Sequence, residues 1–197
     1  DEALYFCLLA SLIESAHRVS NTASIYGAFL KDLKPLAQKS LEFNPLVYEQ
    51  TLIPTQVYCE DANVLIERIA GDILYLDPPY NHRQYGANYH LLNTIACYDS
   101  VEPKGTTGVR AYVSSRYCKA KTAFFALEEM VRKAQFKTLF LSYNNEGLIP
   151  QETLSIMMKK YGRYELFSHE HQRFKAHTHH GKNPKTIEFL HVLEKKG

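Results

Sequence analysis

The stretch Ile-Leu-Tyr-Leu-Asp-Pro-Pro-Tyr at residues 73–80 decides the fold class of this 197-residue chain. Its first four residues form a short apolar run, and such a run predicts a β-strand that is buried on both faces. In open α/β sheets, ligands bind beyond the carboxyl ends of these strands, which is where Asp77 stands. The stretch therefore predicts an α/β fold with a ligand site at Asp77.

The two prolines constrain the backbone that follows the strand. A residue before proline is driven out of the helical region, and proline has a fixed φ and no N–H, so we expect Asp77 and Pro78 to be extended with free carbonyl groups. The Asp77 carboxylate and the Pro78 carbonyl can each accept one hydrogen bond from an amine, while Tyr80 can stack on a planar partner. A nucleobase amine fits these features. The alternative is an ordinary turn, with Asp77 as a turn-forming residue.

Residues 77–80 resemble the catalytic motif of the amino-methyltransferases that use S-adenosylmethionine. The wider context resembles the Dam-like, alpha-group adenine-specific DNA methyltransferases of restriction-modification systems, because the similarity continues over residues 81–96 and resumes at residues 139–148 and 172–175. The resemblance implies that an adenine is flipped out of duplex DNA and that its amine receives a methyl group from S-adenosyl-L-methionine. It implies four catalytic residues, Asp77, Pro78, Pro79 and Tyr80.

The same resemblance bears on cofactor binding. Residues 56–59 look like the family's third core strand, whose acidic end lies near the adenine of the cofactor, and this implies a cofactor site at Glu60, Asp61, Ala62 and Asp77. None of the nine glycines forms the Phe-x-Gly-x-Gly turn that such enzymes place before the motif. The chain also begins without Met. We therefore expect the first two core strands, and with them the N-terminal cofactor-binding part, to lie upstream of residue 1.

Apolar periodicity extends the prediction along the chain. It predicts four helices, at residues 2–18, 91–97, 121–134 and 151–160. It also predicts three further strands, at residues 137–142, 163–169 and 186–194, of which the last two form an antiparallel pair.

The resemblance arranges these elements as a Rossmann-like, S-adenosylmethionine-dependent methyltransferase sheet. This sheet is expected to be mostly parallel, with a C-terminal antiparallel hairpin and its first strands missing. Residues 1–53 are expected to be a helical segment that serves as a DNA-recognition insertion, and residues 54–197 to be an incomplete catalytic core. A plain helical hairpin fits residues 25–31 equally well.

The formal net charge is only +2, so any contact with nucleic acid must be local. Residues 103–123 contain several basic residues, two tyrosines and no acidic residue, which suits contact with phosphate groups. A surface loop with ordinary charges is the alternative. The predicted DNA-binding residues are Arg83, Lys104, Arg110, Arg116, Lys119, Arg173 and Lys175.

Several classes of protein are disfavoured by the composition. The four cysteines are widely spaced without a Cys-x-x-Cys pair, which argues against a zinc knuckle and a disulfide framework. The apolar run at residues 4–13 is too short to span a bilayer and follows two acidic residues, unlike a secretion signal. The histidines at residues 169–180 are typical of an exposed hairpin tip. We predict a bacterial cytoplasmic protein with no metal site and no membrane contact.

Three functional hypotheses follow. The favoured one is a site-specific adenine DNA methyltransferase that acts on double-stranded DNA and belongs with a cognate restriction endonuclease, without a stable complex between the two. The second is a methyltransferase of the same fold that acts on RNA or on a protein glutamine. The third is a truncated, non-catalytic DNA-binding fragment, which the missing glycine-rich turn favours.

Overall fold

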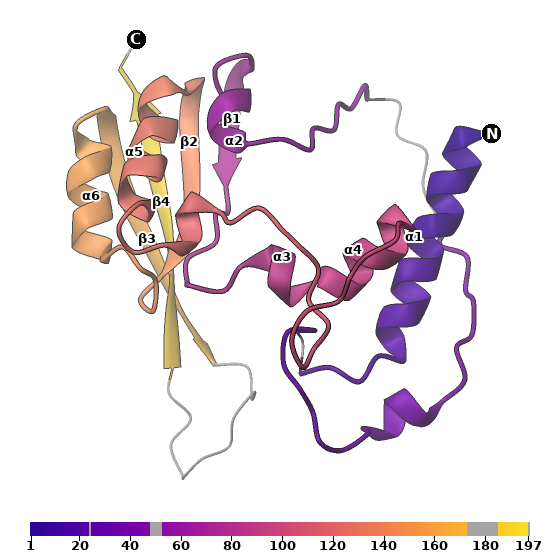
Figure 1. The fold of residues 1–197 in the computed structure, drawn as a ribbon. Helices are drawn as coiled ribbons and strands as arrows, with labels where there is room; N and C mark the ends of the chain where they lie inside the picture. The colour runs from indigo at the N-terminus through magenta and orange to yellow at the C-terminus, as the bar shows by residue number, and fades with distance from the viewer. Residues whose placement is uncertain (24, 48–52, 173–184, 197) are drawn as a thin grey trace. The chain divides into compact units, whose positions relative to one another are not determined.

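The computed structural model describes residues 1–23, 25–47, 53–172 and 185–196, and contacts between residues divide the chain into two units (Figure 1). Unit 1 comprises Asp1–Gln56 and Gln84–Ser114, whereas unit 2 comprises Val57–Arg83 and Ser115–Gly197. The segment that follows the motif therefore folds with the N-terminal part of the chain. The predicted division into residues 1–53 and 54–197 concerns function and stays a prediction.

Among its described residues, unit 2 contains a four-stranded sheet in the order β1-β2-β4-β3. Strand β1 is parallel to β2, whereas β4 is antiparallel to both β2 and β3. This mixed sheet confirms the α/β class and the C-terminal antiparallel pair. Only one of the three pairings is parallel, so the described sheet is not mostly parallel as expected. The strands are β1 (Ala70–Leu76), β2 (Gln135–Asn144), β3 (Gly162–Gln172) and β4 (Lys185–Lys195).

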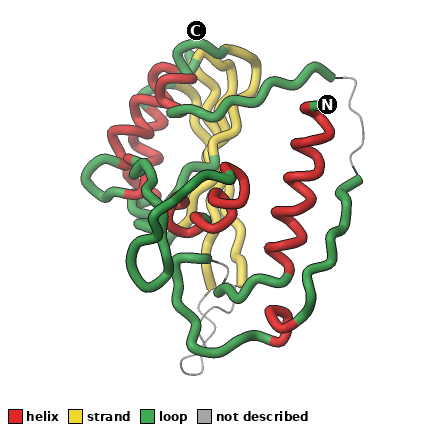
Figure 2. The backbone as a smooth tube through the Cα atoms, turned by 45° about the vertical axis from the view of Figure 1, so that its right-hand side comes forward, coloured by secondary structure: helices red, strands yellow, loops and turns green. Residues whose placement is uncertain are grey.

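Helices α5 (Ala123–Lys133) and α6 (Gln151–Lys159) lie on the same face of this sheet (Figure 2). Both confirm predicted helices. The buried residues of α5 recur at the i, i+3, i+4 spacing of an amphipathic helix. They pack with α6 and with the inward residues of β2 and β4 into one core, which includes Leu127, Met130, Val131, Leu139, Leu141, Leu154, Met157, Met158 and Leu193. Unit 2 also contains the short helices α2 (Ala62–Leu65) and η2 (Arg116–Cys118).

Strand β1 is not buried on both faces, which corrects the expectation from its apolar run. Leu74 and Leu76 pack against the core, whereas Ile73 and Tyr75 on the other face are 65% and 60% exposed. Among the described strands, β1 pairs with β2 alone. The prediction failed because an apolar run states only that a segment can be buried, and the described helices of unit 2 cover one face of the sheet.

Residues 56–59 do not form the predicted strand. They are extended without strand pairing, and Val57 is 91% exposed. A strand requires a hydrogen-bonded neighbour, and in the part of the chain that the structure describes the sheet ends at β1. The sequence of residues 56–59 alone does not show whether a neighbouring strand is present.

Unit 1 begins with helix α1 (Glu2–Arg18), whose bounds are those predicted. The Asp1 carboxylate accepts hydrogen bonds from the backbone N–H groups of Ala3 and Leu4, and basic side chains end the helix. Ser11 and Ser15 are buried on one side of α1. Their hydroxyl oxygens accept hydrogen bonds from the backbone of residues 46 and 44, which holds this extended segment against the helix.

The rest of unit 1 contains η1 (Pro35–Gln38), α3 (Tyr85–Asn88) and α4 (His90–Cys97), the last confirming the helix predicted at residues 91–97. Residues 25–31 form a turn, so the helical-hairpin alternative is wrong. The Tyr26 backbone N–H donates to the Asn88 carbonyl, and its hydroxyl lies 2.8 Å from His17 Nδ1. These long-range contacts override the local helical tendency. No helix among the described residues is long and apolar enough to cross a membrane.

Candidate functional site

Two polar loops leave the carboxyl ends of the parallel strands β1 and β2. Residues 77–80 follow β1, and residues 145–148 follow β2. Because the strands are parallel and adjacent, their carboxyl ends meet at one edge of the sheet. The Leu148 N–H donates a 2.8 Å hydrogen bond to the Tyr80 carbonyl, which ties the two loops together.

The first loop presents two hydrogen-bond acceptors. Residues 77–80 have no regular secondary structure, as the two prolines predict, and Asp77 is exposed. No described residue forms a hydrogen bond or ion pair with the Asp77 carboxylate, and none donates to the Pro78 carbonyl. Pro79 and Tyr80 are half-buried beside them. The expected pair of acceptors and the neighbouring aromatic ring are therefore together on one loop.

The backbone on either side of Tyr80 is fixed by contacts within unit 2. The Cys118 thiol donates to the Arg83 carbonyl at a distance of 3.3 Å. Cys118 is buried, and burial raises the pKa of its thiol. The loop is thus anchored at Tyr80 and again three residues later, so it presents its acceptors from a constrained backbone.

Tyr143, at the end of β2, packs against Tyr80. The two ring centroids are 6.3 Å apart with an interplanar angle of 76°, an edge-to-face arrangement. The Tyr143 ring is 2% exposed, and burial raises the pKa of its hydroxyl. Sequence reasoning assigned no role to this residue or to Gly147. The signal was present in the Ser-Tyr-Asn-Asn-Glu-Gly run, since polar residues after a second parallel strand lie at the same sheet edge.

The predicted cofactor residues other than Asp77 have structural partners. The Glu60 carboxylate pairs with the Arg68 guanidinium, and the Asp61 carboxylate accepts from the Asn63 N–H as the N-cap of α2. Ala62 is the first residue of that helix. Asn63 is buried and donates to the Ala126 carbonyl of α5 at 2.8 Å, so this acidic end is built into the packing of unit 2.

The predicted DNA-binding residues are distributed over both units. Arg83, Arg116 and Lys119 lie in unit 2, whereas Lys104 and Arg110 lie in unit 1. Lys104 forms an isolated β-bridge with Val109. Arg173 and Lys175 lie outside the described residues.

Two of these arginines form ion pairs within their own units. The Arg110 guanidinium makes two hydrogen bonds of 3.1 and 2.7 Å to Asp99, which raise the pKa of the arginine. The Arg116 guanidinium lies 3.1 Å from the Glu129 carboxylate. Hydrogen bonds from Lys133 and Arg116 lower the pKa of Glu129. Any phosphate contact by either arginine must therefore compete with a carboxylate.

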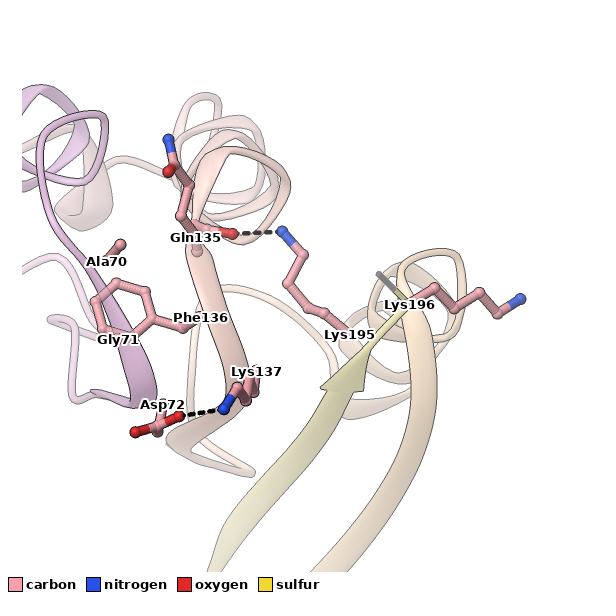
Figure 3. A pocket seen from close by; sticks show the side chains of 9 residues that line it. Ala70, Gly71, Asp72, Gln135, Phe136, Lys137, Lys195 and Lys196 are labelled. Carbon is pink, nitrogen blue, oxygen red and sulfur yellow. Dashed lines mark hydrogen bonds and ion pairs between the residues drawn. The ribbon is translucent and has the colours of Figure 1, made fainter.

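A shallow cavity of about 560 Å³ lies at the opposite end of the sheet, where β1 and β2 begin (Figure 3). Two of its three lysines, Lys137 and Lys195, form side-chain contacts. The Lys195 ammonium donates to the carbonyls of Val131, Arg132 and Ala134 at the end of α5, and Lys137 pairs with Asp72 at 2.6 Å. Burial lowers the pKa of Lys195. These contacts give Lys195 a structural role, and the cavity contains none of the predicted site residues.

The described residues contain no group of three or more His, Cys, Asp or Glu side chains that could hold a metal ion. The histidines at positions 177, 179 and 180 lie outside the described residues.

A mixed α/β sheet that carries this motif at the end of a parallel strand is consistent with the fold of S-adenosylmethionine-dependent methyltransferases. A family model described as the D12 class N6 adenine-specific DNA methyltransferases matches residues 1–157. The chain belongs to this family. No solved structure matches the chain significantly.

Curated relatives support the assignment. The chain is 52% identical to the type II methyltransferase M.NlaIII of Neisseria lactamica, over 99% of this chain and 59% of the relative. It is 38% identical to M.FokI of Planomicrobium okeanokoites, over 99% of this chain and 31% of the relative. It is also 38% identical to M.CviAII of Paramecium bursaria Chlorella virus 1, over 87% of this chain and 52% of the relative. The chain thus spans about three fifths or less of these relatives.

Proposed function

We propose that the chain carries the base-recognition half of a site-specific adenine DNA methyltransferase of the Dam-like alpha group. One observation carries this proposal. The Asp77 carboxylate and the Pro78 carbonyl are unpaired among the described residues, and they adjoin the half-buried Tyr80 on an anchored loop at the carboxyl end of β1. An exocyclic amine needs two acceptors, and a purine ring needs an aromatic face.

The proposed chemistry uses hydrogen bonds rather than a covalent intermediate. The nitrogen lone pair of an adenine amine is delocalised into the ring, which makes the amine a poor nucleophile. Acceptance of one hydrogen bond by Asp77 and one by the Pro78 carbonyl draws both N–H groups out of conjugation and stabilises the positive charge that develops on nitrogen. Because both acceptors are in place before the reaction, they need no reorganisation.

An adenine inside a duplex cannot reach these acceptors, so the base must be flipped out. Flipping costs a few kcal/mol of lost stacking, and contact with an aromatic ring offsets about 1–3 kcal/mol of it. We assign this contact to Tyr80. Its carbonyl is fixed to Leu148, which holds the ring next to Asp77 and Pro78.

The described residues fit the base better than they fit the cofactor. In the D12 class, S-adenosyl-L-methionine supplies the methyl group. Of the four residues expected to bind it, Glu60 and Asp61 use their carboxylates in contacts with Arg68 and the α2 backbone. Asp77 alone has a carboxylate without a partner among the described residues. We therefore assign no step of cofactor binding to this acidic segment.

We further propose that additional strands extend the sheet beyond β1 to complete a Rossmann-like methyltransferase sheet. Two observations support this. Strand β1 has no described neighbour on its outer edge, and its exposed face carries the apolar side chains of Ile73 and Tyr75. An unpaired strand edge favours addition of another strand, and an exposed apolar face favours an element that covers it. The greater length of the relatives agrees with a source outside the 197 residues.

Duplex DNA is the proposed substrate, with residues 1–53 as a recognition segment and a restriction endonuclease of the same specificity as a functional partner that forms no stable complex. Lys104, Lys119 and Arg83 are the proposed phosphate contacts that form no described ion pair. Arg110 and Arg116 are also proposed to contact phosphate, and each would leave its present carboxylate partner on binding DNA. Arg173 and Lys175 complete the proposed set.

A two-part experiment tests the proposal. Transfer of tritiated methyl groups from S-adenosyl-L-methionine is measured with duplex DNA, RNA and protein as acceptors. The chain is assayed alone and co-expressed with the part of M.NlaIII that lies outside the matched region. We expect label in duplex DNA alone, and only in the co-expressed sample. Label in RNA or protein instead would replace the proposed substrate. The second part is calorimetric titration of the chain alone with S-adenosyl-L-methionine. Tight binding would overturn the proposal that the cofactor-binding strands lie outside these 197 residues.

A further inference from the structure

The second loop at the candidate site contains a glycine that the Tyr143 ring requires. A Cβ atom added to Gly147 would lie 2.8 Å from Tyr143 Cζ and closer still to Cε1, distances that real Cβ atoms do not show. The Tyr143 ring therefore lies directly against the Gly147 backbone. With 2% of its surface exposed, this ring has no free space on its other sides into which it could move.

Tyr143 is also tied to the backbone of both loops. Its hydroxyl lies 3.5 Å from the Tyr80 carbonyl and accepts a 3.3 Å hydrogen bond from the Ile149 N–H. The Leu148 N–H donates to the same Tyr80 carbonyl. The ring thus touches Gly147 on one side and Tyr80 on the other, while its hydroxyl joins the two loops.

We propose that Tyr143 is the positioning residue for Tyr80, and that Gly147 is required because it admits the Tyr143 ring. The edge-to-face contact at 6.3 Å sets where the Tyr80 ring lies, and the hydroxyl sets where its carbonyl lies. The role of Tyr80 as the base-stacking residue rests on the proposed function. We call the contacts of Tyr143 with the Tyr80 ring and carbonyl the seat of Tyr80, and this seat is inferred from the structure independently of the proposed function.

A tryptophan reporter tests the seat without any methyl transfer. The chain contains no Trp, so Tyr80→Trp introduces a single indole whose fluorescence anisotropy and acrylamide quenching report how firmly the ring at position 80 is held. In this background we compare Gly147→Ala, Tyr143→Leu and Tyr143→Phe. We expect the quenching constant to rise at least twofold in the first two variants. Tyr143→Phe should give a smaller rise, because it keeps the ring and the Leu148 N–H still holds the Tyr80 carbonyl.

The sheet offers a matched control at its other end. A Cβ at Gly71 would lie 3.0 Å from Phe136 Cε1, so Gly71→Ala also places a methyl group against a ring, but far from Tyr80 along β1. This variant should leave the reporter unchanged. Equal quenching in Gly147→Ala, Tyr143→Leu and the reference, with all three folded by circular dichroism, would overturn the proposal. So would an equal rise in Gly71→Ala.

Two further measurements cover loss of folding and the link to function. In the unaltered chain, nuclear Overhauser cross-peaks between the ring protons of Tyr80 and Tyr143 must be present, and their absence overturns the seat even if no variant folds. Where methyl transfer is detected, Tyr143→Leu should lower kcat about 10²-fold with unchanged KM for S-adenosyl-L-methionine, because misplacement of a reacting group by about 1 Å costs this much. Lack of methyl transfer in every sample counts against the proposed function, and the fluorescence result stands apart from it.

Discussion

The two ends of the β1–β2 pair differ in what their polar groups do. At the amino end, Lys137 is paired with Asp72 (Figure 3), and Lys195 donates to three backbone carbonyls. At the carboxyl end, the Asp77 carboxylate and the Pro78 carbonyl have no partner among the described residues. Yet the backbone that carries them is held as firmly, through the Leu148 N–H and the Cys118 thiol.

This contrast distinguishes the cavity at the amino end from the candidate functional site at the carboxyl end. The amino end has the cavity, but the Lys195 ammonium there already donates to three carbonyls and ties the end of α5 to β4. The carboxyl end has acceptors that folding leaves unused. Asp77 is exposed, so its carboxylate is solvated by water and is free to accept a hydrogen bond from the proposed amine. The proposed function therefore rests on the acceptors at the carboxyl end and not on the cavity at the amino end.

Substitution of Asp77 has the largest expected effect, and it falls on activity. Asp77→Asn replaces half of the carboxylate's acceptors with an amide donor, so stabilisation of the amine in the transition state is lost. In the co-expressed sample, we expect kcat for methyl transfer to duplex DNA to fall about 10²–10³-fold, the usual cost of removing one such interaction. Duplex binding should be retained, as measured by fluorescence anisotropy of a labelled oligonucleotide.

Asp72→Asn is the matched control for this change. It makes the same substitution on the same strand at the other end, where the carboxylate pairs with Lys137. Turnover should equal that of the unaltered protein. Equal losses in the two variants would mean that Asp77 acts through general charge rather than through contact with the amine.

Acid should destabilise unit 2 through His191, which lies in β4 between the two ends. This side chain is fully buried, its Nδ1 lies 2.8 Å from the Tyr164 hydroxyl, and burial lowers its pKa from 6.5 to about 4. Between pH 6.5 and 4 the unfolded state binds the proton and the folded state does not. Stability is therefore complete above pH 6.5 and falls by about 3 kcal/mol as the pH approaches 4.

Urea denaturation at several pH values measures this loss, with His191→Leu as the comparison. The variant lacks the titrating group, so its stability should change less between pH 7 and 4 than that of the unaltered chain. Parallel pH profiles for the two proteins would assign the acid sensitivity to other groups. Above pH 7 the Asp77→Asn variant should match the unaltered chain in stability, since its carboxylate has no described partner to lose.

Lys195→Met tests whether the amino end is structural. Methionine keeps most of the apolar stem but leaves the carbonyls of Val131, Arg132 and Ala134 without their shared donor. The variant also removes a positive charge from the C-terminus of α5. We expect the free energy of unfolding to fall by about 1–2 kcal/mol, because Lys195 is only partly buried. Turnover measured at saturating substrates should not change.

Sequence patterns correctly predicted the helices that depend on nearby residues, through capping and the spacing of apolar side chains. Helix α1 has the predicted bounds because Asp1 caps its start and basic residues end it. Helix α5 was predicted from the spacing of its buried residues. Residues 56–59 were predicted wrongly, because a strand needs a neighbour. The helical alternative for residues 25–31 failed because Tyr26 is held by Asn88, far away in sequence.

The candidate site was predictable to the same extent. Asp77 and Pro78 could be assigned as acceptors because proline acts on its immediate neighbours. The contact of Tyr143 with Gly147 and Tyr80 could not, because it depends on how a loop 63 residues later folds back beside the first. The ion pair between Glu60 and Arg68 could not be predicted either, because the sequence does not show whether an acidic residue in a loop has a basic partner.

Removal of the Asp72–Lys137 pair should have the smallest effect of all. The two side chains are 78% and 82% exposed, and although the hydrogen bond from Lys137 lowers the pKa of Asp72, water solvates both charges nearly as well when they are apart. Lys137→Met should therefore leave the melting temperature unchanged within measurement error at both 50 mM and 500 mM salt. A clear drop that disappears at high salt would mean that this pair helps to hold β1 against β2. The stability of the amino end would then depend on the Asp72–Lys137 ion pair as well as on Lys195, and Asp72→Asn would no longer be a neutral control for Asp77→Asn.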